Sequence, residues 1–281
     1  MGVRIVTDST ADLAAEIRRD LGIEMVPLTV HFGPESFHDV VEMSTDAFWA
    51  KLRSSSHHPK TAQPSPGDFL QVYEALAKEG HEILSIHLSG RLSGTISSGQ
   101  IAAQMTPNAQ ITLVDTRSVT MGLGMMAIEA ARMARDGKPV AEILTRVNAV
   151  ADRMNILFTL DSLEFLQRNG RVGKAQAMLG GLLGIKPILQ VDKEGLVAPA
   201  DKVRGKSKVM PRALEIMQER VPAGRTINLS VLHTQAPEEA STWLTAVRQI
   251  YTVNEHFIAD LGPVVATNAG PGTVGVCFYE V

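Results

Sequence analysis

The sequence predicts an α/β protein of two domains, an N-terminal domain with a mostly parallel βα sheet and a C-terminal domain with a mixed sheet. In the first half of the chain, short apolar runs alternate with amphipathic segments, which is typical of βα units in a parallel sheet. In the second half, the runs 188–191 and 196–198 are joined by "DKEG", which predicts an antiparallel hairpin. We therefore place the two domains at residues 1–153 and 154–281.

The first domain is expected to alternate strands and helices. Ser9 or Thr10 is the expected N-cap of its first helix, Gly22 the C-cap, and Pro139 opens its last helix. The segment 53–66, "RSSSHHPKTAQPSP", is rich in breakers and is expected to form one long loop, of a length that often carries function. We expect strands at residues 3–7, 25–32, 83–87 and 111–115, and helices at 9–22, 43–55, 65–80, 96–105, 121–137 and 139–154.

The second domain contains more apolar runs and fewer helices. The sequence shows no internal repeat, no low-complexity tract and no long linker. We expect strands at residues 155–160, 186–192, 196–199, 226–233, 256–262 and 273–281, and helices at 174–184, 206–220 and 237–250.

Composition argues against several classes of protein. The 281 residues are 44% apolar and carry a formal net charge of -3, which is not the basic excess of a nucleic-acid-binding protein. The single cysteine, Cys277, cannot form an internal disulfide and fits a reducing compartment. No apolar run approaches the roughly 18 residues that span a bilayer, and Asp8 interrupts the N-terminus before the apolar region of a signal peptide could form. We expect a cytoplasmic protein.

The segment "SGRLSGT", residues 89–95, which we call the serine loop, follows an expected strand and precedes an expected helix. In a βα unit this position presents main-chain N–H groups and the positive end of a helix dipole at the carboxyl edge of the sheet, where anions bind. Ser93 and Thr95 add hydroxyl donors, and Gly94 allows close approach of the backbone. The serine loop is therefore a candidate anion site. The alternative is that Ser93 only caps the helix.

Other motifs give weaker signals. The runs 122–127, "GLGMMA", and 270–275, "GPGTVG", match a dinucleotide pattern, but neither lies in a tight turn between a strand and a helix. The sequence has no phosphate loop of the GxxxxGK type and no serine-hydrolase elbow. His57 and His58 lack companion ligands at metal spacing, so we expect no metal site. Asp8 follows the first strand, where it is interpreted as a cap together with Ser9 and Thr10.

Six blocks of the sequence carry a family resemblance: "VRIVTDSTADL", "TAQPSPGDFLQVYEAL", "ILSIHLSGRLSGTISSGQIAA", "VDTRSVTMGLG", "LEFLQRNGRVGKAQAMLGGLLGIKPIL" and "TNAGPGTVGV". In this order and spacing they resemble the DegV family over essentially the whole chain. The resemblance implies a bacterial two-domain α/β protein that binds one long-chain fatty acid. Some members serve as the fatty-acid-binding subunit, FakB, of a fatty acid kinase, whose separate kinase subunit phosphorylates the bound carboxylate to acyl phosphate.

The resemblance also implies a set of binding residues. Thr61 and Ser93 match the carboxylate-binding hydroxyls of the family, and the amides around Ser93 and Gly94 would complete the site. Asn268 stands before the "GPG" turn where fatty-acid-binding members typically have His; its amide can donate to a carboxylate but cannot become cationic. Asn169 replaces a family Gly and is expected to need a left-handed backbone. The supporting residues are Thr95, Gly270 and Arg171.

Two further groups are expected around this site. Flexible apolar side chains are candidates to line the acyl pocket, although ordinary core packing is the alternative for each of them: Met121, Met125, Met178 and Leu179. Basic side chains of the second domain are candidates for docking a kinase subunit or for transient contact with an anionic membrane surface, with a merely solvated basic face as the alternative. The docking candidates are Arg168, Lys202 and Arg204, with Arg171, Lys174, Lys206 and Lys208 nearby in the sequence.

Two functions follow from these residues. The first is a lipid-binding protein that has no catalytic residue and no cofactor and carries a long-chain fatty acid as its ligand. The second is a small-molecule enzyme that acts on an acyl or phosphorylated substrate through Asp8, Thr61 and Ser93. The sequence favours binding, because no nucleophile stands beside a general base in any recognised motif.

Overall fold

The computed structural model describes residues 2–178 and 184–281. The chain divides into two compact units, the first formed by Met1–Asp152 with Gly262–Thr267 and the second by Arg153–Leu261 with Asn268–Val281. A short segment late in the sequence thus belongs to the first unit.

The centre of the first unit is a parallel four-stranded sheet in the order β2-β1-β6-β7. This arrangement confirms the predicted parallel sheet. Because β1 and β6 lie in the middle, their carboxyl ends adjoin at one edge, where loops of βα proteins bind ligands. The strands are β1 (Val3–Asp8), β2 (Ile23–Val26), β6 (Glu82–His87) and β7 (Ile111–Asp115).

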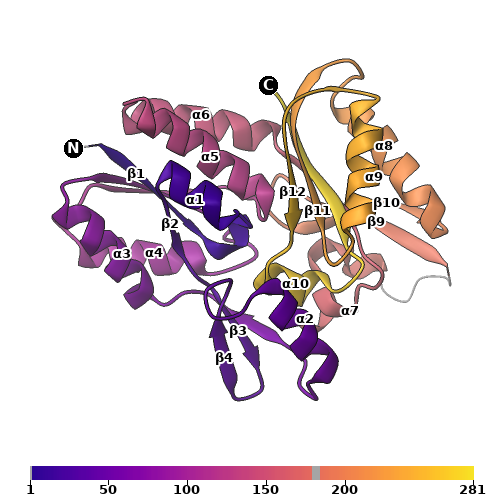
Figure 1. The fold of residues 1–281 in the computed structure, drawn as a ribbon, viewed down its shortest axis with the longest axis horizontal. Coiled ribbons are helices and arrows are strands. Elements are labelled where there is room, and N and C mark those ends of the chain that lie inside the picture. The colour runs from indigo at the N-terminus through magenta and orange to yellow at the C-terminus, as the bar shows by residue number, and fades with distance from the viewer. Residues whose placement is uncertain (1, 179–183) are drawn as a thin grey trace. The chain divides into compact units, whose positions relative to one another are not determined.

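Helices cover both faces of this sheet, with α3 and α4 on one side and α5 and α6 on the other (Figure 1). Aromatic and aliphatic side chains of α3, including Phe69 and Tyr73, pack with Val6 and Ile83 of the sheet. Ser65 caps α3 in a capping box with Asp68. The helices are α1 (Ala15–Leu21), α3 (Pro66–Lys78), α4 (Thr95–Met105), α5 (Met121–Arg135) and α6 (Val140–Arg153).

The prediction of a single strand at residues 25–32 is wrong, because this segment forms two strands that belong to two different sheets. β2 ends before Pro27, which has no N–H for a sheet ladder, and β3 (Thr29–Phe32) begins after it. β3 pairs with β4 (Glu35–His38) and β5 (Lys60–Ala62) in an antiparallel sheet. The expected loop 53–66 therefore contains a strand. α2 (Thr45–Ser54), capped by Ser44, packs Phe48 and Trp49 against this sheet.

The start of the first expected helix is also wrong. Residues Ser9–Ala11 form a short 3-10 turn, and α1 begins only at Ala15, with no side-chain cap. Asp8, rather than Ser9 or Thr10, caps the turn, because its carboxylate accepts from the Thr10 amide. Gly22 ends α1 with φ +62°, so the predicted C-cap is confirmed.

The second unit contains a mixed six-stranded sheet in the order β10-β9-β8-β13-β11-β12. β11 and β12 are parallel and the other neighbours are antiparallel, and β9 with β10 forms the predicted hairpin. Its core gathers Trp243, Phe278 and Met217. The strands are β8 (Asn155–Thr159), β9 (Ile185–Val191), β10 (Val197–Arg204), β11 (Thr226–His233), β12 (Thr252–Asp260) and β13 (Val274–Glu280).

The helices of the second unit differ from the expectation in three places. The expected helix 174–184 is a 3-10 segment over Gly173–Met178, and residues 179–183 lie outside the described residues. Two short helices were not expected, α7 (Glu164–Arg168) in this unit and α10 (Pro263–Ala269), whose residues 263–267 belong to the first unit. The left-handed backbone expected at Asn169 is wrong, since Asn169 has φ -95° and Gly170 has φ +72°. The long helices, as expected, are α8 (Val209–Arg220) and α9 (Pro237–Arg248).

Candidate functional site

The serine loop leaves the carboxyl end of the central strand β6 and runs directly into α4. The chain turns back there, because the amides of Leu92 and Ser93 donate to the carbonyl oxygen of Ser89 over 2.9 and 3.1 Å. The half-buried Ser93 hydroxyl lies 2.9 Å from that of Thr95. Gly94 occupies the N-cap position of α4 without a side-chain hydrogen bond, so the interpretation of Ser93 as a simple cap is wrong. Two hydroxyls thus adjoin the first turn of a helix, whose amides lack partners within the helix.

Thr61 lies in β5, a strand that pairs with β3 in the same unit. Two residues further on, the side-chain amide of Gln63 donates to the Ser98 hydroxyl of α4 over 3.0 Å. Gln63 also covers Gly94, where an added Cβ would overlap its side chain. The structure therefore brings the end of β5, close in sequence to Thr61, against the serine loop.

The other predicted head-group residues belong to the second unit. Asn268 is half-buried near the end of α10. Gly270 follows it with φ +76°, and its carbonyl oxygen accepts from the hydroxyls of Thr234 and Thr273 over 2.9 and 3.1 Å. The Arg171 guanidinium donates over 2.6 Å to a main-chain carbonyl two residues earlier. Their contact with a carboxylate stays a prediction.

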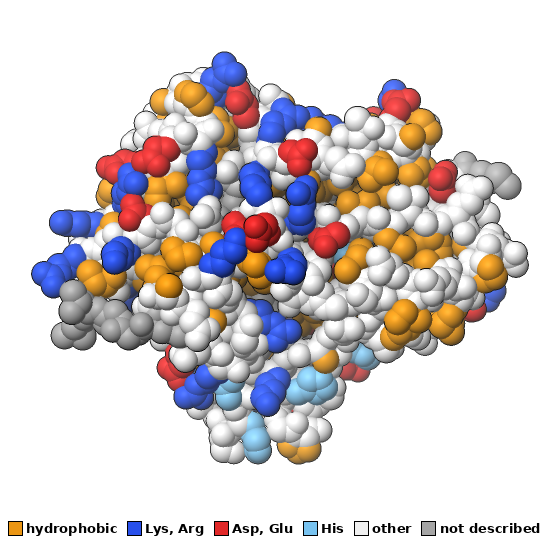
Figure 2. All heavy atoms as spheres, turned by 180° about the vertical axis from the view of Figure 1, so that it is seen from behind, with side chains coloured by type: hydrophobic (Ala, Val, Ile, Leu, Met, Phe, Trp, Pro, Cys, Tyr) orange, Lys and Arg blue, Asp and Glu red, His pale blue; other side chains and the backbone are white. Residues whose placement is uncertain are grey.

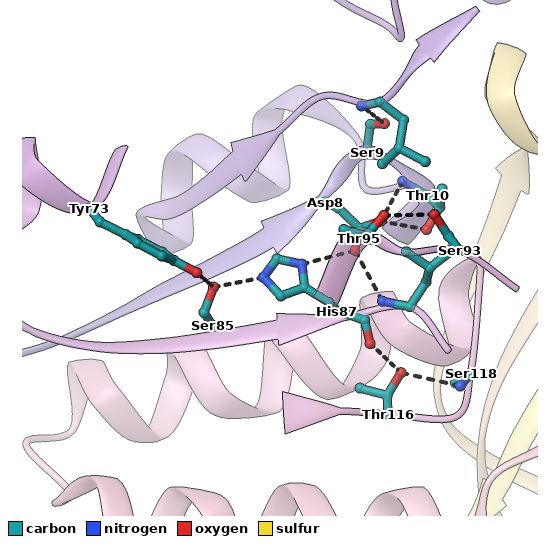
Figure 3. Close-up of polar contacts among 12 residues, drawn as sticks. Asp8, Ser9, Thr10, Tyr73, Ser85, His87, Ser93, Thr95, Thr116 and Ser118 are labelled. Atoms are coloured by element: carbon teal, nitrogen blue, oxygen red, sulfur yellow. Dashed lines mark hydrogen bonds and ion pairs between the residues drawn. The ribbon is translucent and has the colours of Figure 1, made fainter. Parts of the chain in front are cut away.

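Four fully buried polar side chains, which the sequence did not predict as a group, form what we call the buried polar chain (Figure 3). Asp8 Oδ2 lies 3.0 Å from His87 Nδ1, His87 Nε2 lies 2.6 Å from Ser85 Oγ, and Ser85 Oγ lies 2.7 Å from the Tyr73 hydroxyl. Burial raises the pKa of Tyr73 to about 12, against the opposing hydrogen bond with Ser85. The missed signal is "SIH" inside an apolar strand, because every second residue of a strand shares a face.

Asp8 is bound by groups from two loops. Its Oδ1 accepts from the Thr10 amide over 3.1 Å and from the Thr10 hydroxyl over 2.5 Å. Its Oδ2 accepts from the Leu88 amide over 3.0 Å and also lies 3.0 Å from His87 Nδ1. The carboxylate therefore ties the turn after β1 to the first residue after β6.

Two further carboxylates of the first unit hold the start of α10. The Gly262 amide donates to Asp12 Oδ1 over 2.9 Å, and the Val264 amide donates to Asp39 Oδ1 over 3.2 Å. Asp39 is fully buried, and this burial raises its pKa to about 6; the charge of Asp8 acts in the same direction and the Val264 hydrogen bond opposes it. These contacts explain why residues 262–267 belong to the first unit.

The candidate acyl-pocket residues lie in several parts of the chain. Met121 and Met125 are buried in the first turns of α5. Met178 is half-buried at the end of the 3-10 segment, and Leu179 lies outside the described residues. Their contact with an acyl chain stays a prediction.

The basic residues of the second unit are largely paired with acidic ones. Arg168 lies 2.5 Å from Glu164, and Lys174 and Lys206 also make ion pairs. On the face in Figure 2, Lys and Arg side chains are interspersed with Asp and Glu. Lys202 and Arg204 are exposed at alternate positions of β10 and so share a face.

The remaining motifs have structural explanations. Residues 122–127 are buried inside α5; Gly270 and Gly272 lie in the turn before β13, and Gly275 lies within that strand. Across residues 2–178 and 184–281, no cluster of His, Cys, Asp and Glu could hold a metal ion. Within the same ranges, no helix combines the length and hydropathy needed to cross a membrane.

Comparisons with known proteins agree with this fold. A family model described as "Uncharacterised protein, DegV family" matches residues 2–281. A DegV domain-containing protein of Deinococcus radiodurans is 38% identical over 98% of both chains, and Protein DegV of Bacillus subtilis is 32% identical over 99% of both.

Solved structures of similar proteins have the same fold as this chain. A DegV family protein from Thermus thermophilus, described for its fatty acid binding, matches with a TM-score of 0.92 and 34% identity over 100% of both chains. DegV from Bacillus subtilis, described as a fatty acid binding protein, matches with a TM-score of 0.88 and 31% identity over 100% of both. The chain belongs to the DegV family.

Proposed function

We propose that this chain binds one long-chain fatty acid and holds its carboxylate at the serine loop. The observation that carries the proposal is the Ser93 hydroxyl, which faces Thr95 beside the N-terminus of α4 instead of capping the helix. Hydroxyls and helix amides are the donors that a carboxylate requires when it leaves water. The solved relatives described as fatty acid binding proteins support the same ligand class.

The acyl tail would supply most of the affinity. Each buried methylene contributes about 0.8 kcal/mol, so about 15 of them would contribute roughly 12 kcal/mol before the entropy of binding is subtracted. The head group then needs satisfied hydrogen bonds rather than a strong net attraction. We assign Thr61, Ser93, Gly94 and Asn268 to that role, with Met121, Met125 and Met178 along the tail.

We further propose that the bound carboxylate is presented to a separate fatty acid kinase subunit, which would convert it to acyl phosphate. The exposed Lys202 and Arg204 of β10 support a docking surface for an acidic partner. Asn268→His restores the residue that fatty-acid-binding members typically have. With a bacterial fatty acid kinase, it should change acyl phosphate formation more than fatty acid affinity, and equal changes in both would contradict this role.

Binding is favoured over the alternative of an enzyme acting through Asp8, Thr61 and Ser93. Asp8 is fully buried; its Oδ1 accepts hydrogen bonds from Thr10 and its Oδ2 accepts one from Leu88. A carboxylate in that state cannot reach a substrate without breaking the turn that it caps. Turnover of an acyl or phosphoryl substrate by the purified chain would restore the alternative.

The direct test is to identify the ligand. Denaturing extraction of the purified protein followed by mass spectrometry should yield about one long-chain fatty acid per chain. In a binding titration, the double variant Thr61→Ala with Ser93→Ala should bind fatty acid about tenfold more weakly or worse, because two hydrogen bonds to a charged group are lost.

A matched control for the double variant is Ser54→Ala with Thr145→Ala. It also removes two hydroxyls from the first unit, but each of these donates to a carbonyl of its own helix. The control should keep the affinity of the wild type. Equal affinities of all three proteins would show that the head-group assignment is wrong.

A further inference from the structure

The proposed function gives no role to the buried polar chain of Asp8, His87, Ser85 and Tyr73. All four side chains have 0% exposure, and they join three elements of the first unit, β1, β6 and α3. Figure 3 shows them in a line that ends at Asp8, beside the turn that carries Thr10. Such a buried network needs every donor and acceptor satisfied, because the desolvation of each polar group is otherwise uncompensated.

One assignment of hydrogens satisfies the whole chain. Both oxygens of Asp8 accept from main-chain amides, so His87 donates to Asp8 through Nδ1 and its Nε2 accepts from the Ser85 hydroxyl. Ser85 in turn accepts from Tyr73, whose pKa of about 12 keeps its hydroxyl protonated. The hydrogen bonds then all point from α3 toward Asp8.

The geometry of α3 matches that of β6. Phe69 packs edge-on against the His87 ring, with centroids 5.0 Å apart and an angle of 83°, while Tyr73, four residues later, reaches Ser85. Four residues of helix advance about 6 Å and two residues of strand about 6.6 Å, so both pairs are in register. The same helix therefore acts on the His87 ring twice, directly through Phe69 and indirectly through Tyr73 and Ser85.

The buried polar chain ends at the base of the serine loop. Asp8 Oδ2 accepts from the Leu88 amide, the residue directly before the loop. On the other side, the carbonyl oxygen of His87 accepts from the Thr116 hydroxyl over 2.8 Å and from the Thr116 amide over 3.1 Å. Residues 87 and 88 are therefore held from both sides, which defines where the loop leaves the sheet.

We propose that Asp8 and His87 are positioning residues for the serine loop, which they hold in the orientation that binds a carboxylate, with Ser85 and Tyr73 fixing His87. The proposal rests on the proposed function, because it takes the carboxylate of a fatty acid as the bound group. Neither residue contacts the ligand; both act through the Leu88 amide and the chain direction at the start of the loop.

The test compares affinities for two ligands with the same tail, palmitate and 1-hexadecanol, by displacement of a fluorescent fatty acid. Asp8→Asn keeps the size of the side chain but replaces one acceptor oxygen by a donor. It should lower the ratio of palmitate to hexadecanol affinity about tenfold, because a misplaced loop loses hydrogen bonds to the charged group. Hexadecanol affinity should change little. A residue that only stabilised the fold would lower both affinities together or neither.

Tyr73→Phe is the milder variant. If Asp8→Asn does not fold, the ratio of palmitate to hexadecanol affinity is measured on Tyr73→Phe and Ser85→Ala instead. Tyr73→Phe should lower the ratio about threefold in the same direction. Its matched control is Tyr251→Phe, which also removes a buried hydroxyl hydrogen bond, here 2.7 Å to the Val221 carbonyl in the second unit. The control should leave the ratio unchanged.

Amide hydrogen exchange, measured on peptides by mass spectrometry, tests the positioning without any ligand. Peptides covering residues 88–95 should exchange faster in Tyr73→Phe than in Tyr251→Phe or the wild type. If Tyr73→Phe and Ser85→Ala change neither the ratio nor this exchange, the positioning role is wrong. If the wild type fails to bind palmitate while exchange responds as expected, the proposed ligand is wrong and the positioning of the loop stands.

Discussion

The two units bury different kinds of side chain. The first unit encloses two carboxylates and a histidine, Asp8, Asp39 and His87, near the carboxyl edge of its parallel sheet. Among the described residues of the second unit, no carboxylate is buried, and its core is an apolar cluster around Trp243 and Phe278. A buried charge stabilises a fold less well than apolar packing does, so its presence points to a requirement for position. The comparison teaches that the first unit buries polar groups beside its loops, whereas the second unit is built around an apolar cluster.

The largest expected effect is in the apolar core of the second unit. Trp243→Ala should lower the free energy of unfolding by about 3–5 kcal/mol, because it removes a large buried ring and leaves a cavity. Urea unfolding followed by circular dichroism measures the loss. The ratio of palmitate to hexadecanol affinity of the folded variant should match the wild type. A loss under 1 kcal/mol would contradict the view that this cluster stabilises the unit.

The next effect concerns pH and the buried Asp39 of the first unit. Its pKa rises from 3.8 to about 6 on folding, so the folded state binds more protons than the unfolded state between these values. The free energy of unfolding should therefore fall as pH rises from about 4 to about 6, by about 2 kcal/mol from this group.

Asp39→Asn isolates that contribution. The amide oxygen can still accept from Val264, and the variant no longer titrates, so its stability should fall less than that of the wild type between pH 4 and 6. Urea unfolding at several pH values measures the difference, with the exposed Asp136→Asn as the control. Parallel pH curves for the wild type and Asp39→Asn would contradict the assignment.

The same substitution in both units sharpens the comparison. Tyr73→Phe and Tyr251→Phe each remove one buried hydroxyl, and each should lower the free energy of unfolding by about 1 kcal/mol. Only Tyr73→Phe should also speed amide hydrogen exchange in the serine loop and lower the ratio of palmitate to hexadecanol affinity. If the two variants behave alike in stability, hydrogen exchange and ligand preference, the buried hydroxyl of the first unit has no role in positioning the serine loop.

The smallest effect is expected at the surface of the second unit. Lys174 lies 2.7 Å from Asp192 and 2.9 Å from Glu194, and the hydrogen bond to Asp192 is the main cause of its raised pKa. The Lys174 side chain is 47% exposed, so solvent screens both pairs. Lys174→Ala should leave the thermal midpoint unchanged within experimental error. A shift as large as that of Tyr251→Phe would mean that surface ion pairs contribute to this unit.

Several elements could be predicted because their signals are local. Ser44 and Ser65 stand directly before the helices that they cap, and "DKEG" joins the strands of its hairpin. The position of the serine loop between a strand and a helix could be predicted, because the apolar run before it and the amphipathic run after it are both local signals; anion binding there stays a prediction. The pairing of β5 with β3 could not be predicted, because a strand of three residues has too few positions to show alternation.

The sequence by itself determined the class of the fold and the family, because each depends on neighbouring residues or on blocks in a fixed order. Only the tertiary structure decided that residues 262–267 belong to the first unit and that Asp8 meets His87, 79 positions away. Contacts between distant segments leave no periodic pattern in the chain. They form because the fold brings buried polar groups close enough to satisfy one another.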